Sequence, residues 1–148
     1  MNKIIYLDTN ILLHYQPFDQ INWPKIVNAK SVTIVFPPLT IRELNNHKEL
    51  HPRPHIKKRA GEMIKRLFGL FSSGPKTELT KEILVYFEDR DPTIDFSAHQ
   101  LNPSVQDDHL IASIIRVFPK SKKESQIVKV VVTKQTTTQK RFSCTILH

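Results

Sequence analysis

The segment IIYLDTNILL, residues 4–13, decides the fold. Its first four residues are apolar and Asp8 follows them at once, a pattern typical of a strand that is buried in a parallel sheet. Thr9 and Asn10 carry the kind of side chain that caps helices, so residues 11–13 are expected to begin a short helix. A buried strand, an acid and a helix start therefore follow one another directly.

The rest of the chain repeats this alternation. Residues 32–36 are largely β-branched and stop at two prolines, which predicts a second strand, and residues 39–47 predict a short helix that carries Glu43. Residues 83–87 and 128–132 predict further strands, and residues 108–118 a further helix. Strands that alternate with helices indicate an α/β fold with a mostly parallel sheet, here as a single domain over residues 1–148.

The clearest helix is predicted between residues 55 and 71. Its apolar residues follow the i, i+4, i+7 spacing of one buried stripe: Ile56, Ala60, Met63, Ile64, Leu67, Phe68 and Phe71. Its other face is basic and carries Lys57, Lys58, Arg59, Lys65 and Arg66. This face is either a surface that binds RNA phosphates or an ordinary solvated helix face.

Composition narrows the function. Lys and Arg total 22 against 14 Asp and Glu, a net charge of +8 that favours a polyanionic partner, nucleic acid first. The glycine-rich phosphate-binding motifs are absent, which argues against the usual nucleotide-binding sites. Apolar runs are too short for a membrane span or a signal-peptide core, and the lone Cys144 suits a reducing compartment. We therefore expect a cytoplasmic protein without a membrane partner.

Four acids stand at the ends of the apolar elements. Asp8 follows the first strand, Glu43 follows the second by seven residues, and Asp107 and Asp108 begin a predicted helix. Ligands of parallel α/β sheets bind beyond the carboxyl ends of the strands, where these acids are expected to meet. Clustered carboxylates need a positive charge among them, and hard oxygen ligands suit Mg²⁺ or Mn²⁺.

Each acid also has a purely structural interpretation. Asp8 could cap the helix that follows it, and Glu43 could pair with Arg42 or Lys48 on the helix surface. The acids at 107–108 could cap a helix or stabilise its first turn through the helix dipole. Only the order and setting of the acids distinguish a site from these alternatives.

Three motifs together resemble the PIN-domain nucleases, both bacterial toxin-type and eukaryotic-type. They are YLDTNIL at residues 6–12, PLTIREL at 38–44 and DDHLIAS at 107–113, and the resemblance runs from about residue 4 to 133. It implies a three-layer α/β/α sandwich and a divalent-metal-dependent endoribonuclease that hydrolyses RNA phosphodiester bonds. A 5′-phosphate and a 3′-hydroxyl are the products it implies.

The resemblance also implies roles for individual residues. The family's catalytic and metal-binding acids map onto Asp8, Glu43 and Asp108, with Asp107 as an additional metal ligand. The supporting polar residues are Thr9, Asn10 and Thr133.

The chain departs from the family after its last strand. Residues 130–133 read VVVT as expected, but Lys134 and Gln135 follow where an acid is usual, and the tail from about residue 134 is atypical. The alternative is therefore a catalytically weak PIN-like module that binds RNA or a protein partner. An antitoxin protein, as in toxin–antitoxin pairs, and a homodimer are the protein partners that the resemblance suggests.

Other enzyme classes fit less well. A haloacid-dehalogenase-like phosphatase needs a second aspartate where this chain has Asn10, and a response regulator needs its acidic pair beside the first strand. His51 and His55 have the i, i+4 spacing of a zinc-binding pair, but Pro52 and Pro54 argue against one regular helical turn there.

Overall fold

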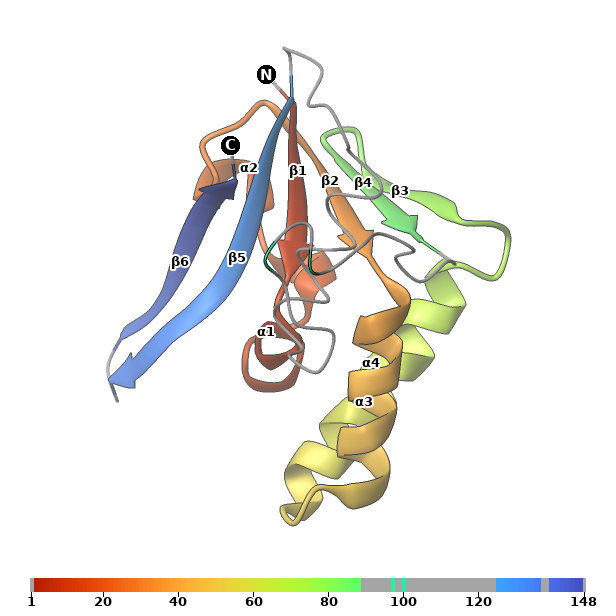
Figure 1. Ribbon diagram of the computed structural model, residues 1–148. Helices are drawn as coiled ribbons and strands as arrows, with labels where there is room; N and C mark the ends of the chain where they lie inside the picture. The colour runs from red at the N-terminus through yellow and green to blue at the C-terminus, as the bar shows by residue number, and fades with distance from the viewer. Residues whose placement is uncertain (1, 89–96, 98–99, 101–124, 137–138, 148) are drawn as a thin grey trace.

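The apolar runs of the sequence become the central strands of a single sheet. The structure, a computed structural model, describes residues 2–88, 97, 100, 125–136 and 139–147, the last two segments through their backbone. The strands are β1 (Asn2–Leu7), β2 (Ser31–Phe36), β3 (Lys76–Thr80), β4 (Ile83–Phe87), β5 (Ser125–Thr136) and β6 (Gln139–Leu147). They lie in the order β3-β4-β2-β1-β5-β6 (Figure 1).

The four central strands are parallel and each edge strand is antiparallel. β1 pairs with β2 and β5, and β2 pairs with β4, all in parallel, whereas β3 and β6 return antiparallel to their neighbours. The register aligns Tyr6 with Val35 and Val35 with Tyr86. The carboxyl ends of the parallel strands therefore open onto the same edge of the sheet, as an α/β ligand site requires.

The helices connect these strands. They are α1 (Thr9–His14), the short 3-10 helix η1 (Phe18–Gln20), α2 (Trp23–Ile26), α3 (Pro38–Leu50) and α4 (Pro54–Leu70). A proline opens both α3 and α4, a position where its missing N–H costs no helical hydrogen bond. The two helices lie side by side and project past the carboxyl edge of the sheet (Figure 1). Among the helices described, none is long and apolar enough to cross a membrane.

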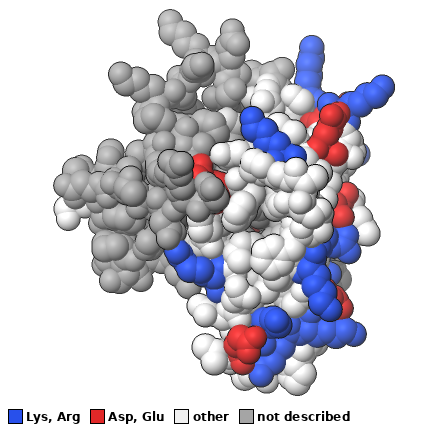
Figure 2. All heavy atoms as spheres, turned by 90° about the vertical axis from the view of Figure 1, so that its right-hand side faces the viewer, with Lys and Arg blue, Asp and Glu red and all other residues white. Residues whose placement is uncertain are grey.

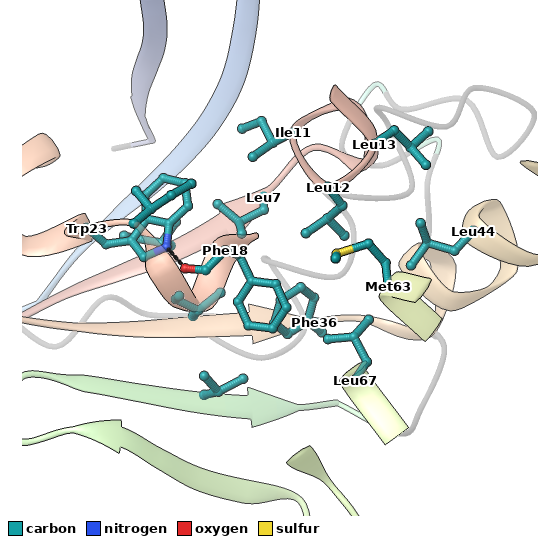
Figure 3. Close-up of a cluster of buried hydrophobic side chains, with 14 of the residues drawn as sticks. Leu7, Ile11, Leu12, Leu13, Phe18, Trp23, Phe36, Leu44, Met63 and Leu67 are labelled. Atoms are coloured by element: carbon teal, nitrogen blue, oxygen red, sulfur yellow. Dashed lines mark hydrogen bonds between the residues drawn. The ribbon is translucent and has the colours of Figure 1, made fainter. Parts of the chain in front are cut away.

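One face of the sheet carries the main core. Leu7 and Phe36 meet Leu12 of α1, Leu44 of α3 and Met63 of α4 in one apolar cluster (Figure 3). The ring of Phe18 stands edge-on to that of Phe36, with centroids 5.1 Å apart. The buried indole of Trp23 donates its Nε1–H to the carbonyl of Phe18 at 2.8 Å, so its polar atom is satisfied within the core.

The opposite face of the sheet is buried as well. Ile4, Tyr6 and Val35 form a second cluster, with Leu39 and Tyr86 packed against it. Burial on both faces explains why residues 4–7 form an uninterrupted apolar run rather than an alternating one. The prediction of an α/β fold with a buried parallel first strand is confirmed.

Three parts of the chain differ from the expectations. Phe68 was assigned to the buried stripe of the helix but is 62% exposed, because it lies one position past Leu67 and turns out of the interface. The other predicted stripe residues are buried or packed against the core. The strand β3 was not predicted, and the tail after residue 134, which shows little pattern, continues β5 and then forms β6.

Candidate functional site

Asp8 stands at the carboxyl end of β1, where the sequence placed it. Its backbone is extended and its Oδ1 accepts a hydrogen bond from the backbone N–H of Asn10 at 3.0 Å, so it is the N-cap of α1. The helix cap expected of Thr9 and Asn10 is therefore one residue earlier. Among the described residues, Oδ2 of Asp8 accepts no hydrogen bond, so the structural role of this carboxylate engages one of its two oxygens.

Thr9 links the first motif to the second. Its buried hydroxyl donates a hydrogen bond to Oε2 of Glu43, which lies in the second turn of α3. The predicted supporting residue therefore ties the second predicted acid to the residue that follows the first. Lys48, one proposed alternative partner of Glu43, instead lies 3.9 Å from Glu49.

Glu88 is a further acid at the same edge, and the sequence analysis overlooked it. It follows β4 directly, and its backbone N–H donates to the carbonyl of Phe36 at 3.0 Å, so it continues the parallel register past the end of β2. In that register Asp8 and Glu88 are level, each beside Pro37, which places their backbones roughly 10 Å apart across two strand spacings. The available signal was the position of Glu88, one residue after an apolar strand, as Asp8 is.

A buried tyrosine adjoins these acids. The hydroxyl of Tyr6 is fully buried and has no hydrogen-bond partner among the described residues. Burial, followed by the negative charge of Glu88 and then by Tyr86, raises the pKa of Tyr6 well above its usual value. The phenol therefore stays neutral and keeps its proton close to Glu88.

The remaining predicted acids lie outside the described residues. Asp107 and Asp108 belong to that part of the chain, and Thr133 lies in β5, which is described through its backbone. Within the described residues, no three His, Cys, Asp or Glu side chains form a group that could hold a metal ion. The described acids alone therefore do not form the predicted metal site, which stays a prediction.

Two of the five basic residues predicted to bind RNA are engaged inside the fold. Arg59 donates from Nε to the carbonyl of Leu12 at 3.0 Å and from NH2 to the carbonyl of Tyr15 at 2.5 Å. Nη1 of Arg66 donates to both carboxylate oxygens of Asp19, at 2.9 Å to Oδ1 and 2.6 Å to Oδ2. Both guanidinium groups join α4 to the segment after β1, so their geometry supports a structural role for these two arginines.

The other three predicted basic residues, Lys57, Lys58 and Lys65, are exposed on α4. Figure 2 views the side of the molecule on which α3, α4 and β3 lie. Its Lys and Arg atoms form several separate groups, with Asp or Glu atoms beside most of them. The exposed lysines of α4 are thus the described basic groups that best match the predicted phosphate-binding surface.

A shallow hollow lies at the opposite end of the sheet. Its volume is about 230 Å³ and its lining includes Asn2 and Ser31, the first residues of β1 and β2, together with Glu78 and Glu82. Its charged lining is two glutamates against the single Lys81, a net negative wall that disfavours a phosphate, and the hollow is remote from Asp8 because it opens at the amino ends of the strands. It does not compete with the carboxyl edge as a nucleic-acid site.

No protein-family model matches the chain, and the searches of curated proteins and of solved structures also gave no match.

Proposed function

We propose that this protein is a divalent-metal-dependent endoribonuclease with a PIN-like, three-layer architecture. The observation that carries the proposal is the hydrogen bond from Thr9 to Glu43. It holds two acids from separate motifs at the carboxyl edge of a parallel sheet, where α/β proteins bind ligands.

The donor set fits a hard cation. Asp8 and Glu43 offer carboxylate oxygens, with Glu88 at the same edge and Asp108 and Asp107 as the ligands that the resemblance adds. A bound Mg²⁺ or Mn²⁺ supplies charge neutralisation at a scissile phosphate and a more acidic water. The Thr9 hydroxyl orients Glu43, and Asn10 holds Asp8 through its backbone N–H, so both carboxylates are positioned before a cation binds.

The exposed lysines of α4 then provide the affinity for RNA. Lys57, Lys58 and Lys65 attract phosphates without reading bases, so binding is expected to weaken steeply as salt rises. Arg59 and Arg66 serve this surface indirectly by holding α4 in place.

The proposal is tested on single-stranded RNA with the purified full chain. We expect cleavage that requires Mg²⁺ or Mn²⁺, stops with a chelator and leaves a 5′-phosphate. Cleavage that persists in chelator contradicts a site that works through a metal ion. Cleavage that leaves a 2′,3′-cyclic phosphate contradicts it as well.

The second candidate is a PIN-like module that binds RNA or a protein partner, such as an antitoxin or a second copy of the chain, without cutting. It is favoured by Lys134, which lies within β5 at the position where the resemblance implies an acid. RNA binding that is retained in full without any metal-dependent cleavage identifies this second function.

A further inference from the structure

Histidines from three helices lie around the corner between α3 and α4, and His47 follows Glu43 by four residues on α3. His47 lies in the last turn of α3, His51 is its C-cap, and His55 lies in the first turn of α4. His14, the last residue of α1, is the fourth. The pKa of His14 is lowered first by burial and then by His51, His47, His55 and Arg53, which places all of these groups within electrostatic range of it.

The spacing of His47 and His51 forms a true helical pair. The backbone N–H of His51 donates to the carbonyl of His47 at 3.2 Å, so the last turn of α3 is closed and both side chains leave the same face. Their ring centroids are 5.4 Å apart, with 39° between the ring planes. His51 and His55, which share the same sequence spacing, belong instead to different helices, as Pro52 and Pro54 indicated.

This separation suits a shared metal ion. Two imidazoles bound to one tetrahedral Zn²⁺ have centroids roughly 5 Å apart, because each Zn–N bond is about 2.0–2.1 Å long. Both histidines are half-buried, so neither side chain is fully withdrawn from solvent. Imidazole nitrogen is a ligand for Zn²⁺ and its neighbours in the transition series and a poor one for Mg²⁺.

We propose that His47 and His51 form a binding site for a Zn²⁺-class cation at the carboxyl end of α3, built from imidazoles rather than carboxylates. Within the described residues no third ligand already stands in metal-binding geometry, so water completes the coordination.

The proposed site shares His51 with a hydrogen bond in the turn between α3 and α4. Nδ1 of His51 accepts a hydrogen bond from the backbone N–H of Arg53 at 3.0 Å. A metal bound at Nε2 requires the ring proton to sit on Nδ1, which removes this acceptor. Zn²⁺ binding therefore replaces the Arg53 hydrogen bond, and the amide of Arg53 reports on occupancy.

The test is calorimetric titration of the full chain with Zn²⁺ in excess Mg²⁺, at a pH near neutrality. We expect one site whose affinity falls roughly tenfold or more in His47→Gln and in His51→Gln, with circular dichroism unchanged. Asp8→Asn and His55→Gln are the matched controls and should keep the affinity within a few-fold. In the wild type, the Arg53 amide resonance should shift as Zn²⁺ is added.

Two results overturn the proposal. One is Zn²⁺ affinity that is unchanged in the folded double variant His47→Gln/His51→Gln. The other is Zn²⁺ affinity that is lost in Asp8→Asn, which assigns the ion to the acidic edge. The first result leaves RNA cleavage untouched, so this inference can fail while the proposed function stands. The second result overturns this inference and supports a metal site at the acidic edge.

Discussion

The hydroxyl of Thr9 donates a hydrogen bond to the carboxylate of Glu43, a residue 34 positions further along the chain. Thr9 is buried at the start of α1, and Glu43 projects from α3. The bond therefore joins the loop after β1 to the helix after β2 and brings the two clearest acidic motifs of the sequence to one place.

Replacement of Thr9 should lower both the stability of the fold and the rate of RNA cleavage. Thr9→Val removes the donor to a charged acceptor while keeping the side-chain shape, and we expect a loss of about 1–3 kcal/mol in the free energy of unfolding. Because Glu43 also loses its orientation, metal-dependent cleavage should fall by more than tenfold. Thr9→Ser keeps the hydroxyl and is the control, measured by urea unfolding and by RNA cleavage; Ser and Val variants of equal activity would argue against the role of this bond.

The basic residues of α4 should divide into two groups. Arg59→Ala removes two hydrogen bonds from a guanidinium to main-chain carbonyls, and we expect about 2–4 kcal/mol of destabilisation in chemical unfolding. The double variant Lys57→Ala/Lys58→Ala should have a free energy of unfolding within about 0.5 kcal/mol of the wild type. It should instead bind RNA more weakly, with an affinity that depends less on salt concentration. If the lysine variant binds RNA as the wild type does at each salt concentration, α4 is not part of the binding surface.

Glu88 should contribute to the metal requirement of cleavage. Glu88→Gln keeps the size and the backbone contact to Phe36 but removes a charge from the carboxyl edge, so roughly tenfold more Mn²⁺ should be needed for half-maximal cleavage. Glu82→Gln, at the exposed amino edge, is the matched control. An identical Mn²⁺ dependence in the two variants would remove Glu88 from the site.

Acid should destabilise the protein through His14. The folded-state pKa of His14 lies below its usual 6.5, first because of burial and then because of nearby His51, His47, His55 and Arg53. The unfolded chain therefore binds this proton more readily, so the stabilising effect is complete above pH 6.5 and is lost as the pH falls below it. In chelator, the melting temperature should fall as the pH is lowered from about 7.5 to 5.5, and His14→Gln should make this fall smaller. An equal fall in the variant would assign the effect to another group.

The central strands and the helix beginnings were predictable because local pattern determines them. The continuous apolar run before Asp8 is buried on both faces, and the prolines before residue 39 both end β2 and begin α3. The stripe of α4 followed from helical spacing, except at Phe68, where the pattern cannot tell the edge of an interface from its centre.

The contacts between motifs could not be predicted from local pattern. Nothing in the sequence near Arg59 indicates that it donates to carbonyls of α1, since those acceptors are main-chain atoms without a sequence signal. Glu88 was missed because the strand before it has an ambiguous pattern, and only the register of β4 against β2 aligns it with Asp8. The pair of His47 with His51 has the same i, i+4 spacing as His51 with His55, but the predicted helix ended at residue 47, whereas α3 extends to Leu50.

The most direct measurement is the rate of Mn²⁺-dependent cleavage of single-stranded RNA by Asp8→Asn, Glu43→Gln and Glu49→Gln. Asparagine still caps α1, and Glu49 is an exposed residue of the same helix as Glu43, so all three variants should fold. We predict that Asp8→Asn and Glu43→Gln each lower the rate by at least about a hundredfold and that Glu49→Gln leaves it unchanged. Wild-type rates in Asp8→Asn and Glu43→Gln would contradict a nuclease site built on these acids.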